Sequence, residues 1–509
     1  MLIQLKDLGL QYGTRTILDD ANVTFTYDQK IGVIGRNGAG KSSLCKLIVG
    51  EEEPSSGHVK FGPDLVLSYL EQKDPYTPEE TVLDFLTRYA DKLEWECGKM
   101  AARFGLTQEQ LNDPIGSLSG GYQMRVKLTA MLLKDPNFLI LDEPTNYLDL
   151  HTLLFLERFL QEYKGSYLIV SHDREFLKKT CDHTLDVEHG KAVLYKGDVE
   201  EYLGYKAAQR EQKVAFNKGV ERQKKQLQAF VDRFGAKASL AASAQSKRKA
   251  MERLHSIHID HHLSTVRIKM PEIPEKKGSA VEVAHLAIGY PNKKVASKIV
   301  LSIGRGEHVA VLGDNGQGKS TFMKTIMGDL ASLGGEIKWS QGLNVGYYAQ
   351  HVYQKLDDRD TVHSYLESVA APATPRQTVL DMAGCFLFGG DEAKKKISVL
   401  SGGERARMYL AGLLLAKKDV LLLDEPTNHL DFETVEALAD SLQDYKGTVV
   451  FISHDRTFVN TLATKIIEVK DGHVKLYPGT YEEYVYHLEQ TMETELGEAK
   501  GKPEKKVKG

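Results

Sequence analysis

Short apolar runs rich in β-branched residues recur along the chain, and each is followed by polar or glycine-rich residues. The runs occupy residues 31–34, 138–141, 167–170, 309–312, 420–423 and 449–452. Continuous apolar runs of this length are typical of strands that are buried on both faces. Amphipathic segments such as 153–163 and 435–442 lie between them. The alternation predicts βαβ units, and therefore an α/β fold with mostly parallel sheets covered by helices.

The pattern changes between about residues 202 and 259, where charged residues at helical spacing replace the apolar runs. It predicts two helices joined by an exposed apex near RFGAKASLAASAQSKRK. Residues 203–259 contain 13 Lys or Arg and 4 Asp or Glu, a local charge of +9 in a chain whose formal net charge is −4. Charge alone leaves two interpretations open, a solvated pair of helices or a surface for a polyanion.

The same words appear twice in the same order. GRNGAGKSS, LSGG, LDEPTN and SHDR are followed later by GDNGQGKST, LSGG, LDEPTN and SHDR. The offset is 278 residues from Lys41 to Lys319 (319 − 41) and 282 from Glu143 to Glu425 (425 − 143). The chain therefore reads as an internal duplication. The predicted division is a first nucleotide-binding domain at 1–200, a basic helical linker at 201–262, a second nucleotide-binding domain at 263–490 and a short charged tail at 491–509.

Composition narrows the class of protein. The chain has 509 residues, too many for one core, and 41% hydrophobic with 27% charged residues is ordinary for a folded protein. Its four cysteines are far apart and form no CxxC pair, which argues against a disulfide framework or a zinc site. The N-terminus does not resemble a secretory signal, and no uncharged apolar run approaches roughly 18 residues. We therefore expect a cytoplasmic protein.

A GxxxxGK[ST] sequence stands between a predicted strand and a predicted helix in each repeat. Glycines let backbone N–H groups close on a phosphate, and the helix dipole favours the anion. The lysine then reaches the β- and γ-phosphates, and the hydroxyl after it can hold Mg²⁺. The first predicted loop comprises Gly35, Arg36, Asn37, Gly38, Ala39, Gly40, Lys41, Ser42 and Ser43. The second comprises Gly313, Asp314, Asn315, Gly316, Gln317, Gly318, Lys319, Ser320 and Thr321.

Two adjacent acids end a predicted strand in each LDEPTN sequence. Asp142 and Asp424 are positioned to hold Mg²⁺, together with Ser42 and Ser320. The next residues, Glu143 and Glu425, are the predicted catalytic residues that orient or deprotonate the attacking water. The predicted cofactors are accordingly ATP and Mg²⁺, and the predicted reaction is hydrolysis of ATP to ADP and phosphate.

LSGGYQMR at 118–125 and LSGGERAR at 400–407 resemble the signature of the ABC ATPases. The resemblance implies that each signature caps ATP held by the opposing cassette, so that Ser119, Gly120 and Gly121 serve the Lys319 site and Ser401, Gly402 and Gly403 serve the Lys41 site. It also implies further roles at matching positions. These are Gln72 and Gln350 as Mg²⁺-sensing residues, His172 and His454 as γ-phosphate switches, Asp149 and Asp431 as D-loop residues, and Tyr12 and Tyr290 as adenine-stacking rings. An ordinary strand aromatic remains the alternative for both tyrosines.

Twin cassettes on one chain, a charged helical linker and no membrane domain resemble the ABC-F family. Zinc modules, very long coiled coils and a cysteine-rich iron–sulfur domain, which mark other non-transport ABC proteins, have no counterpart in this sequence. The resemblance implies a monomer that binds the ribosome at its exit-tRNA site in the ATP state and acts through the linker apex on P-site tRNA near the peptidyl-transferase centre. Regulation of translation, relief of stalling and protection from antibiotics all fit this resemblance. The basic residues expected to contact RNA are Arg233, Lys237, Lys247, Arg248 and Lys249.

Two points stay open. Many members of this family carry an arm between the Q-loop and the first signature, but Gln72 and Ser119 are only 47 residues apart (119 − 72), so no such insertion is expected here. The alternative function is that of a cytosolic ATPase subunit of an ABC transporter that works with a separate permease. That alternative leaves the basic linker without a role.

Overall fold

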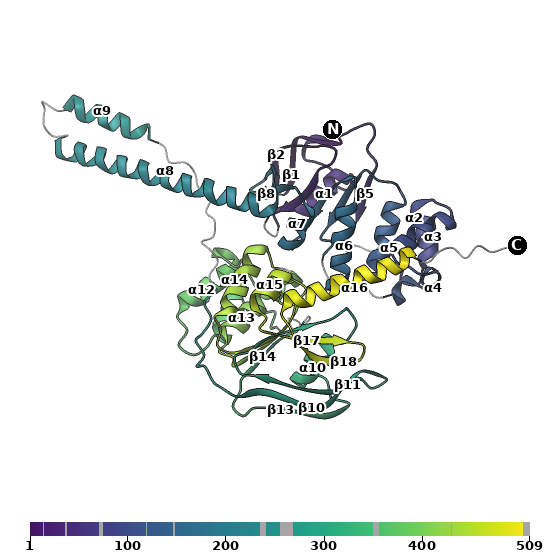
Figure 1. The fold of residues 1–509 in the computed structure, drawn as a ribbon. Coiled ribbons are helices and arrows are strands. Elements are labelled where there is room, and N and C mark those ends of the chain that lie inside the picture. Colours follow the sequence, from purple (N-terminus) through teal and green to yellow (C-terminus); the bar gives the residue numbers. More distant parts are fainter. Residues whose placement is uncertain are drawn as a thin grey trace.

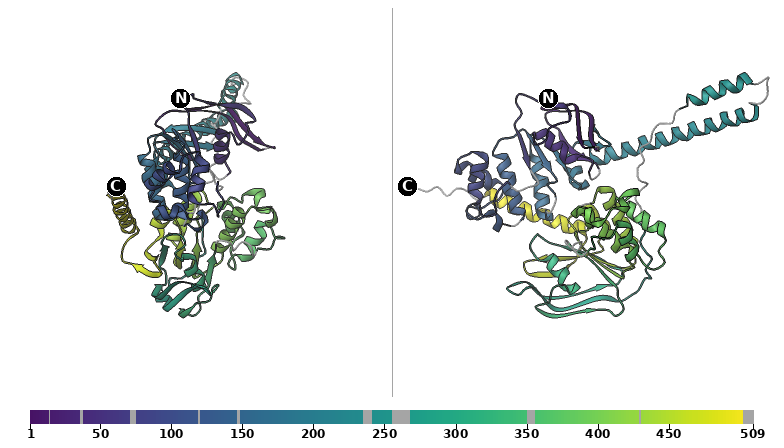
Figure 2. Two further views of the ribbon diagram at one scale, coloured as in Figure 1. Left: turned by 90° about the vertical axis from the view of Figure 1, so that its right-hand side faces the viewer. Right: turned by 180° about the vertical axis from the view of Figure 1, so that it is seen from behind.

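The structure is a computed structural model, and it describes residues 1–13, 15–35, 38–70, 75–118, 120–145, 148–234, 241–254, 268–349, 356–428 and 430–501. Each repeat folds into a cassette of its own, and the two cassettes lie against each other with a helical hairpin projecting to one side (Figure 1). The view from behind in Figure 2 shows the same projection of the hairpin. Among the described residues, every helix is too short or too polar to cross a membrane.

A six-stranded sheet forms the centre of each cassette within the described residues, and all neighbours are parallel except the last pair. The first runs in the order β5 (Leu67–Leu70), β6 (Phe138–Asp142), β7 (Ser166–Val170), β3 (Lys30–Ile34), β8 (His183–Glu188), β9 (Lys191–Lys196). The second runs in the order β14 (Val345–Tyr348), β15 (Val420–Asp424), β16 (Thr448–Ile452), β12 (His308–Leu312), β17 (Lys465–Lys470), β18 (His473–Tyr477). The two orders match position by position, which confirms the predicted duplication and the α/β class.

Alternate residues of each central strand belong to different cores. Phe138 and Ile140 pack in the core that faces the N-terminal antiparallel sheet, whereas Leu139 and Leu141 pack in the core below the helices. Because side chains alternate across a strand, a strand covered on both faces needs an unbroken apolar run. This is why the runs read as continuous in the sequence.

A three-stranded antiparallel sheet covers one face of each central sheet within the described residues. In the first cassette it consists of β2 (Arg15–Phe25), β1 (Ile3–Tyr12) and β4 (Ser56–Phe61). In the second it consists of β11 (Lys293–Gly304), β10 (Ser279–Tyr290) and β13 (Gly334–Trp339).

Helices cover the rest of each sheet. Those of the first cassette are α1 (Lys41–Val49), α2 (Val82–Ala90), α3 (Glu94–Arg103), α4 (Gln108–Leu111), α5 (Gly120–Leu132), α6 (Leu150–Glu162) and α7 (Arg174–Thr180). Those of the second are α10 (Lys319–Met327), α11 (Val362–Val369), α12 (Arg376–Cys385), α13 (Gly402–Leu415), α14 (Phe432–Gln443), α15 (Arg456–Leu462) and α16 (Tyr481–Gly501).

The hairpin consists of α8 (Val199–Phe234) and α9 (Ala241–Glu252), as the charge pattern predicts. The base of α8 is fixed to the first cassette. Tyr202 is buried and donates a hydrogen bond to Asp186 at 2.6 Å, and the Lys206 ammonium lies 2.6 Å from the same carboxylate. The predicted domain boundary at residue 200 therefore falls inside a continuous helix whose first turns pack on the cassette.

The last helix also crosses a predicted boundary. α16 begins on the second cassette and runs alongside α6 of the first (Figure 1). Its Val485 and Leu488 pack against cores of both cassettes. Residue 491, the expected start of a charged tail, lies within this helix, and residues 502–509 lie outside the described part of the chain.

Candidate active site

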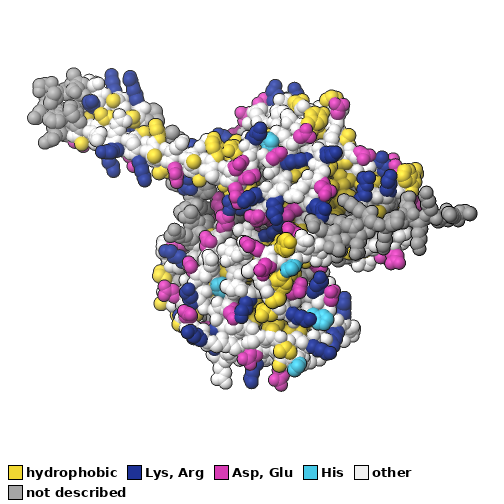
Figure 3. Space-filling model, viewed as in Figure 1, with side chains coloured by type: hydrophobic (Ala, Val, Ile, Leu, Met, Phe, Trp, Pro, Cys, Tyr) yellow, Lys and Arg dark blue, Asp and Glu magenta, His cyan; other side chains and the backbone are white. Residues whose placement is uncertain are grey.

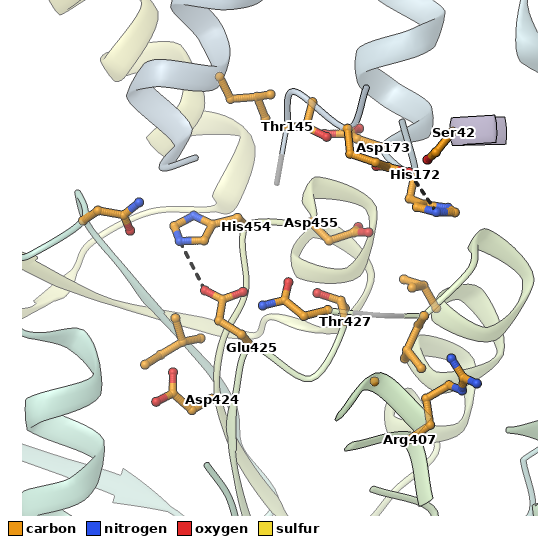
Figure 4. Close-up of a pocket in the computed structure, with 18 of the residues that line it drawn as sticks. Ser42, Thr145, His172, Asp173, Arg407, Asp424, Glu425, Thr427, His454 and Asp455 are labelled. Carbon is orange, nitrogen blue, oxygen red and sulfur yellow. Dashed lines mark ion pairs between the residues drawn. The ribbon is translucent and has the colours of Figure 1, made fainter. Parts of the chain in front are cut away.

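A cavity of about 1020 Å³ lies between the cassettes, and both contribute to its wall (Figure 4). The lining includes the residues predicted for phosphate binding and hydrolysis in each repeat. These are Lys41, Ser42, Glu143 and His172 from the first cassette, and Lys319, Ser320, Asp424, Glu425 and His454 from the second. Most of them stand at the carboxyl ends of parallel strands, where sheets of this kind bind ligands.

The two phosphate loops lead directly into helices. Gly40 precedes α1 with φ of 103°, and Gly318 precedes α10 with φ of 107°. A side chain at either position would collide with Ile17 or Val295, so both glycines are required by conformation and by space. The first residues of α1 and α10 line the cavity, and the positive end of each helix dipole favours an anion there.

The two lysines of these loops are buried. Lys41 donates to the Gly35 carbonyl and Lys319 to the Gly313 carbonyl, each at 2.8 Å. Burial lowers the pKa of both ammonium groups, and nearby carboxylates, those of Glu143 and Glu425 foremost, oppose the shift.

A hydroxyl and a carboxylate meet behind each lysine. Ser42 donates to Asp142 at 3.1 Å, and Ser320 donates to Asp424 at 3.2 Å. Burial raises the pKa of both aspartates. The Oδ2 atom of Asp424 is buried and has no hydrogen-bond partner among the described residues. A buried carboxylate oxygen without a donor beside a hydroxyl suits a hard cation such as Mg²⁺.

Each predicted catalytic glutamate contacts the histidine of the same repeat. The distance from Oε1 to Nε2 is 3.1 Å for Glu143 and His172, and 3.2 Å for Glu425 and His454. Burial lowers the pKa of His454 to about 3, so its imidazole is neutral at physiological pH.

Both glutamates have a positive backbone φ, 51° for Glu143 and 56° for Glu425. Residues other than glycine seldom adopt this conformation. Their N–H groups donate to the neighbouring strand at Val170 and Ile452. The bond fixes the turn, and the turn aims the carboxylate at the cavity.

Contacts across the cassette boundary join the two halves of the site. The Asp149 carboxylate accepts a hydrogen bond from the Asn315 N–H at 3.1 Å, and Asp149 also caps α6 by accepting from Thr152. On the other side, Asp431 caps α14 and lies close enough to Lys41 to oppose the lowering of its pKa by burial. Of the two predicted D-loop aspartates, Asp149 therefore contacts the phosphate loop of the opposing cassette, and Asp431 lies near the lysine of the other loop.

The signature glycines differ in position. Gly403 lines the cavity, and Arg407 of the same helix lies on the side of Ser42 and His172 in Figure 4. Ser401 caps α13 in a capping box with Glu404. Gly120 and Gly121 of the first signature are not among the lining residues.

Of the remaining predicted residues, the structure describes the two tyrosines but not several loop residues. Tyr12 lines the cavity at the end of β1, whereas Tyr290 at the end of β10 does not. The residues outside the described part of the chain are Arg36, Asn37, Gln72, Ser119 and Gln350.

Several polar residues of the site were not predicted. Thr145 and Thr427 bond to Ser171 and Ser453 at 2.9 Å and 3.0 Å, tying the turn after each predicted catalytic glutamate to the loop that carries the histidine. Arg407 belongs to a repeated position, since Arg125 lies 282 residues before it. Repetition at a constant offset was the signal that would have identified all of these residues.

Comparisons with known proteins agree with this geometry. Residues 18–146 and 296–428 match a family model described as ABC transporter, and residues 185–268 match a second model with the same description. The ATP-binding protein YbiT of Escherichia coli O157:H7 is 34% identical, over 94% of this chain and 98% of that protein. ABC transporter F family member 5 of Arabidopsis thaliana is 31% identical, over 97% of this chain and 78% of that protein.

Solved structures show the same fold at lower identity. The RNase-L Inhibitor has a TM-score of 0.66 at 21% identity, with 96% of this chain and 93% of that chain covered. The archaeal ribosome recycling factor aABCE1, in complex with the ribosomal stalk protein aP1, has a TM-score of 0.64 at 20% identity, with 91% and 87% covered.

Proposed function

Because the chain belongs to the ABC-F family of tandem ABC ATPases, we propose that it binds the ribosome in its ATP state. In this proposal the α8–α9 hairpin enters the exit-tRNA site, acts on P-site tRNA near the peptidyl-transferase centre, and leaves after hydrolysis. The chain is an ATP hydrolase. The ribosome, the tRNA and a cytoplasmic location are the parts that the proposal adds.

In the proposed mechanism the phosphate loops hold ATP through backbone N–H groups, Lys41 and Lys319. A bound Mg²⁺ would be held by Ser42 with Asp142 and by Ser320 with Asp424, and would neutralise charge on the phosphate oxygens. Glu143 and Glu425 orient a water molecule and accept its proton. His172 and His454, each in contact with its glutamate, place an imidazole ring at the γ-phosphate position.

The proposal includes two composite sites, and the relations between the cassettes support it. Asp149 lies at the Lys319 loop, and Asp431 lies near Lys41. Binding of ATP at both loops then draws the cassettes together, and hydrolysis weakens that contact. The tyrosine Tyr12 is proposed to stack on the adenine of the Lys41 site, with Tyr290 in the matching role.

The single observation that carries the ribosomal part is the hairpin. Lys247, Arg248 and Lys249 are exposed on α9, and Lys218 and Arg222 extend the basic surface along α8 (Figure 3). Exposed Lys and Arg on a projecting helix pair suit a phosphate backbone, and their spacing away from the cassettes leaves the ATP sites free. Arg233 and Lys237, also expected to bind RNA, have side chains outside the described part of the chain.

The test is co-sedimentation of the Glu143→Gln/Glu425→Gln variant with purified bacterial ribosomes, with and without ATP. ATP-dependent pelleting with ribosomes is expected, because the variant keeps ATP and the closed state that ATP favours. A parallel membrane pellet serves as the control for the transporter alternative. Recovery in membranes without ribosome binding would reject the ribosomal function and favour an ATPase that works with a permease.

A further inference from the structure

An arginine follows the histidine and aspartate of each SHDR sequence, and both arginines reach across the cassette boundary. Arg456 of α15 lies 2.5 Å from the Glu157 carboxylate on α6 of the first cassette. Arg174 of α7 forms an ion pair with Glu436 on α14 of the second cassette. We call the first the buried pair and the second the exposed pair.

The two pairs differ in burial. The side chains of Arg456 and Glu157 are 5% and 6% exposed, whereas those of Arg174 and Glu436 are 25% and 43% exposed. An exposed ion pair is screened by water, and a buried, charge-assisted hydrogen bond is much less so. The buried pair therefore constrains its two helices more strongly than the exposed pair does.

The difference in burial between the two pairs follows from different residues at matching positions of the repeats. The residue 282 positions after Glu157 is Ala439, and the residue 282 positions before Glu436 is Leu154. Both are buried and apolar. The second cassette consequently has no carboxylate at the position from which Glu157 acts, so the buried pair exists on one side only.

The buried pair lies beside one ATP site. Arg456 is two residues after His454, whose ring contacts Glu425, and Asp455 between them caps α15 through the Phe458 N–H at 2.8 Å. Glu157 lies in the middle of α6, and Asp149, which caps the N-terminus of α6, contacts the Asn315 N–H of the same site. Helix α6 thus contacts the second cassette at both the phosphate loop and the histidine loop.

We propose that Glu157 is a positioning residue for the Lys319–Glu425 site, and that it acts by holding Arg456 so that His454 stays against Glu425. Hydrolysis at this site then depends on the docking of α6 from the first cassette. At the matching position the Lys41–Glu143 site has only the weaker exposed pair, which does not hold its histidine in place, so the two sites are unequal. The inference rests on the proposed catalytic roles of Glu143 and Glu425 and is independent of ribosome binding.

Site-resolved kinetics on the full-length chain test the inference. In the Glu143→Gln background only the Lys319–Glu425 site turns over, and in the Glu425→Gln background only the Lys41–Glu143 site does. Adding Glu157→Gln is expected to lower kcat roughly tenfold in the first background, within the usual range of couplings between sites, and less than about twofold in the second. KM for ATP should change less than about twofold in both, because the phosphate loops are untouched.

Two further variants separate positioning from general destabilisation. Glu157→Asp keeps the charge and should restore much of the lost kcat, and Glu436→Gln, which breaks the exposed pair, should change kcat less than about twofold in either background. If Glu157→Gln does not fold, as judged by its melting curve, Glu157→Asp alone is compared in the two backgrounds. Its shorter side chain keeps the charge but lengthens the contact with Arg456, so a partial loss of kcat, confined to the first background, is expected. Equal losses in both backgrounds, no loss, or a loss confined to the second background would overturn the inference.

The assignment of the glutamates is checked separately. The Glu143→Gln/Glu425→Gln double variant should lose at least about a hundredfold in turnover, and turnover near that of the unchanged chain would reject the catalytic roles rather than the role of Glu157. If the double variant has lost its turnover and Glu157→Gln leaves the ratio of the two sites' kcat values unchanged, only the positioning role of Glu157 is rejected.

Discussion

The Asp149 carboxylate of the first cassette accepts a hydrogen bond from the backbone N–H of Asn315 in the second, at 3.1 Å. The same carboxylate caps α6 through the Thr152 N–H at 2.9 Å. One side chain therefore both starts a helix and contacts the phosphate loop of the opposing cassette. Any rotation of α6 relative to the second cassette must stretch this contact.

Asp149→Asn separates these two tasks. Asparagine is as good a helix cap as aspartate, but its amide nitrogen cannot accept a hydrogen bond from Asn315. We expect the melting temperature to stay unchanged and KM for ATP at the Lys319 site to rise about two- to tenfold, the effect of one net hydrogen bond. Turnover in the Glu143→Gln background measures this site, and the Glu425→Gln background is the control. Equal increases in both backgrounds would contradict the local role of the contact.

Replacement of both predicted catalytic glutamates is the second prediction. Glu143→Gln/Glu425→Gln should lower ATP turnover by at least about a hundredfold, because glutamine cannot accept a proton from water. ATP binding, measured by fluorescence titration or calorimetry, should persist within about threefold, because the lysines and loop N–H groups remain. Each single variant should keep the turnover of its intact site. Full turnover in the double variant would remove both residues from the catalytic role.

The hairpin carries the third prediction. Replacing Lys247, Arg248 and Lys249 with alanine removes three exposed cations, and should weaken ribosome binding about tenfold or more at moderate salt. The slope of log affinity against log salt should fall by up to about 2 to 3, since each lost phosphate contact removes a released counterion. Turnover of ATP without ribosomes should not change.

The matched control for the hairpin replaces three exposed lysines on the cassettes, Lys60, Lys99 and Lys475. The net charge changes equally, so a general loss of attraction would appear in both triple variants. Equal weakening in the two would show that overall charge, and not the hairpin, binds the ribosome.

The fourth prediction concerns pH. Burial, with the nearby Asp173 carboxylate, raises the pKa of Asp455 from 3.8 to about 7. A raised pKa means that the protonated acid is the form favoured by folding. Its stabilisation is complete below the unfolded pKa of 3.8 and is lost as the pH rises through about 7.

Asp455→Asn should therefore melt higher than the unchanged chain at pH 8, by on the order of 2–4 °C for each kcal/mol regained, and the difference should shrink towards pH 5. Asparagine keeps the cap on α15, so the comparison isolates the charge. Asp440→Asn, at an exposed position on α14, is the control and should give a constant difference. A difference for Asp455→Asn that does not vary with pH would exclude the titration of this carboxyl.

The strands and the two phosphate loops were predictable because each is specified locally. The run at 138–141 is apolar throughout, which a strand buried on both faces requires, and Gly40 and Gly318 adopt positive φ in the turn that the GxxxxGK[ST] spacing demands. Each motif also occurs in both halves of the chain, so the prediction for one copy could be compared with the other.

The contacts between cassettes were not predictable from sequence. Glu157 is one of many charged residues on an amphipathic helix, and its counterpart Ala439 gives no sign of a partner. Its importance comes from the docking of α6 against α15, a relation between segments 299 residues apart. The positive φ of Glu143 and Glu425 is likewise a result of tertiary bonding, because glutamate has no local preference for that conformation. The predicted boundary at residue 490 falls inside helix α16 for a similar reason, because the packing of its Val485 and Leu488 on both cores is a tertiary relation.

The fixed base of α8 gives the molecule a lever. The helix runs from Val199 to Phe234 and rises about 1.5 Å per residue, so its far end is roughly 40 Å from Lys206, where the cassette holds it. Lys206 binds two carboxylates of the first cassette, and Tyr202 is buried at the base of the helix. These contacts make the helix turn with the cassette instead of bending at its base. Each degree through which the first cassette rotates then sweeps the far end by roughly 1 Å. Small rotations of the first cassette at the ATP sites therefore become large displacements at the end of the hairpin.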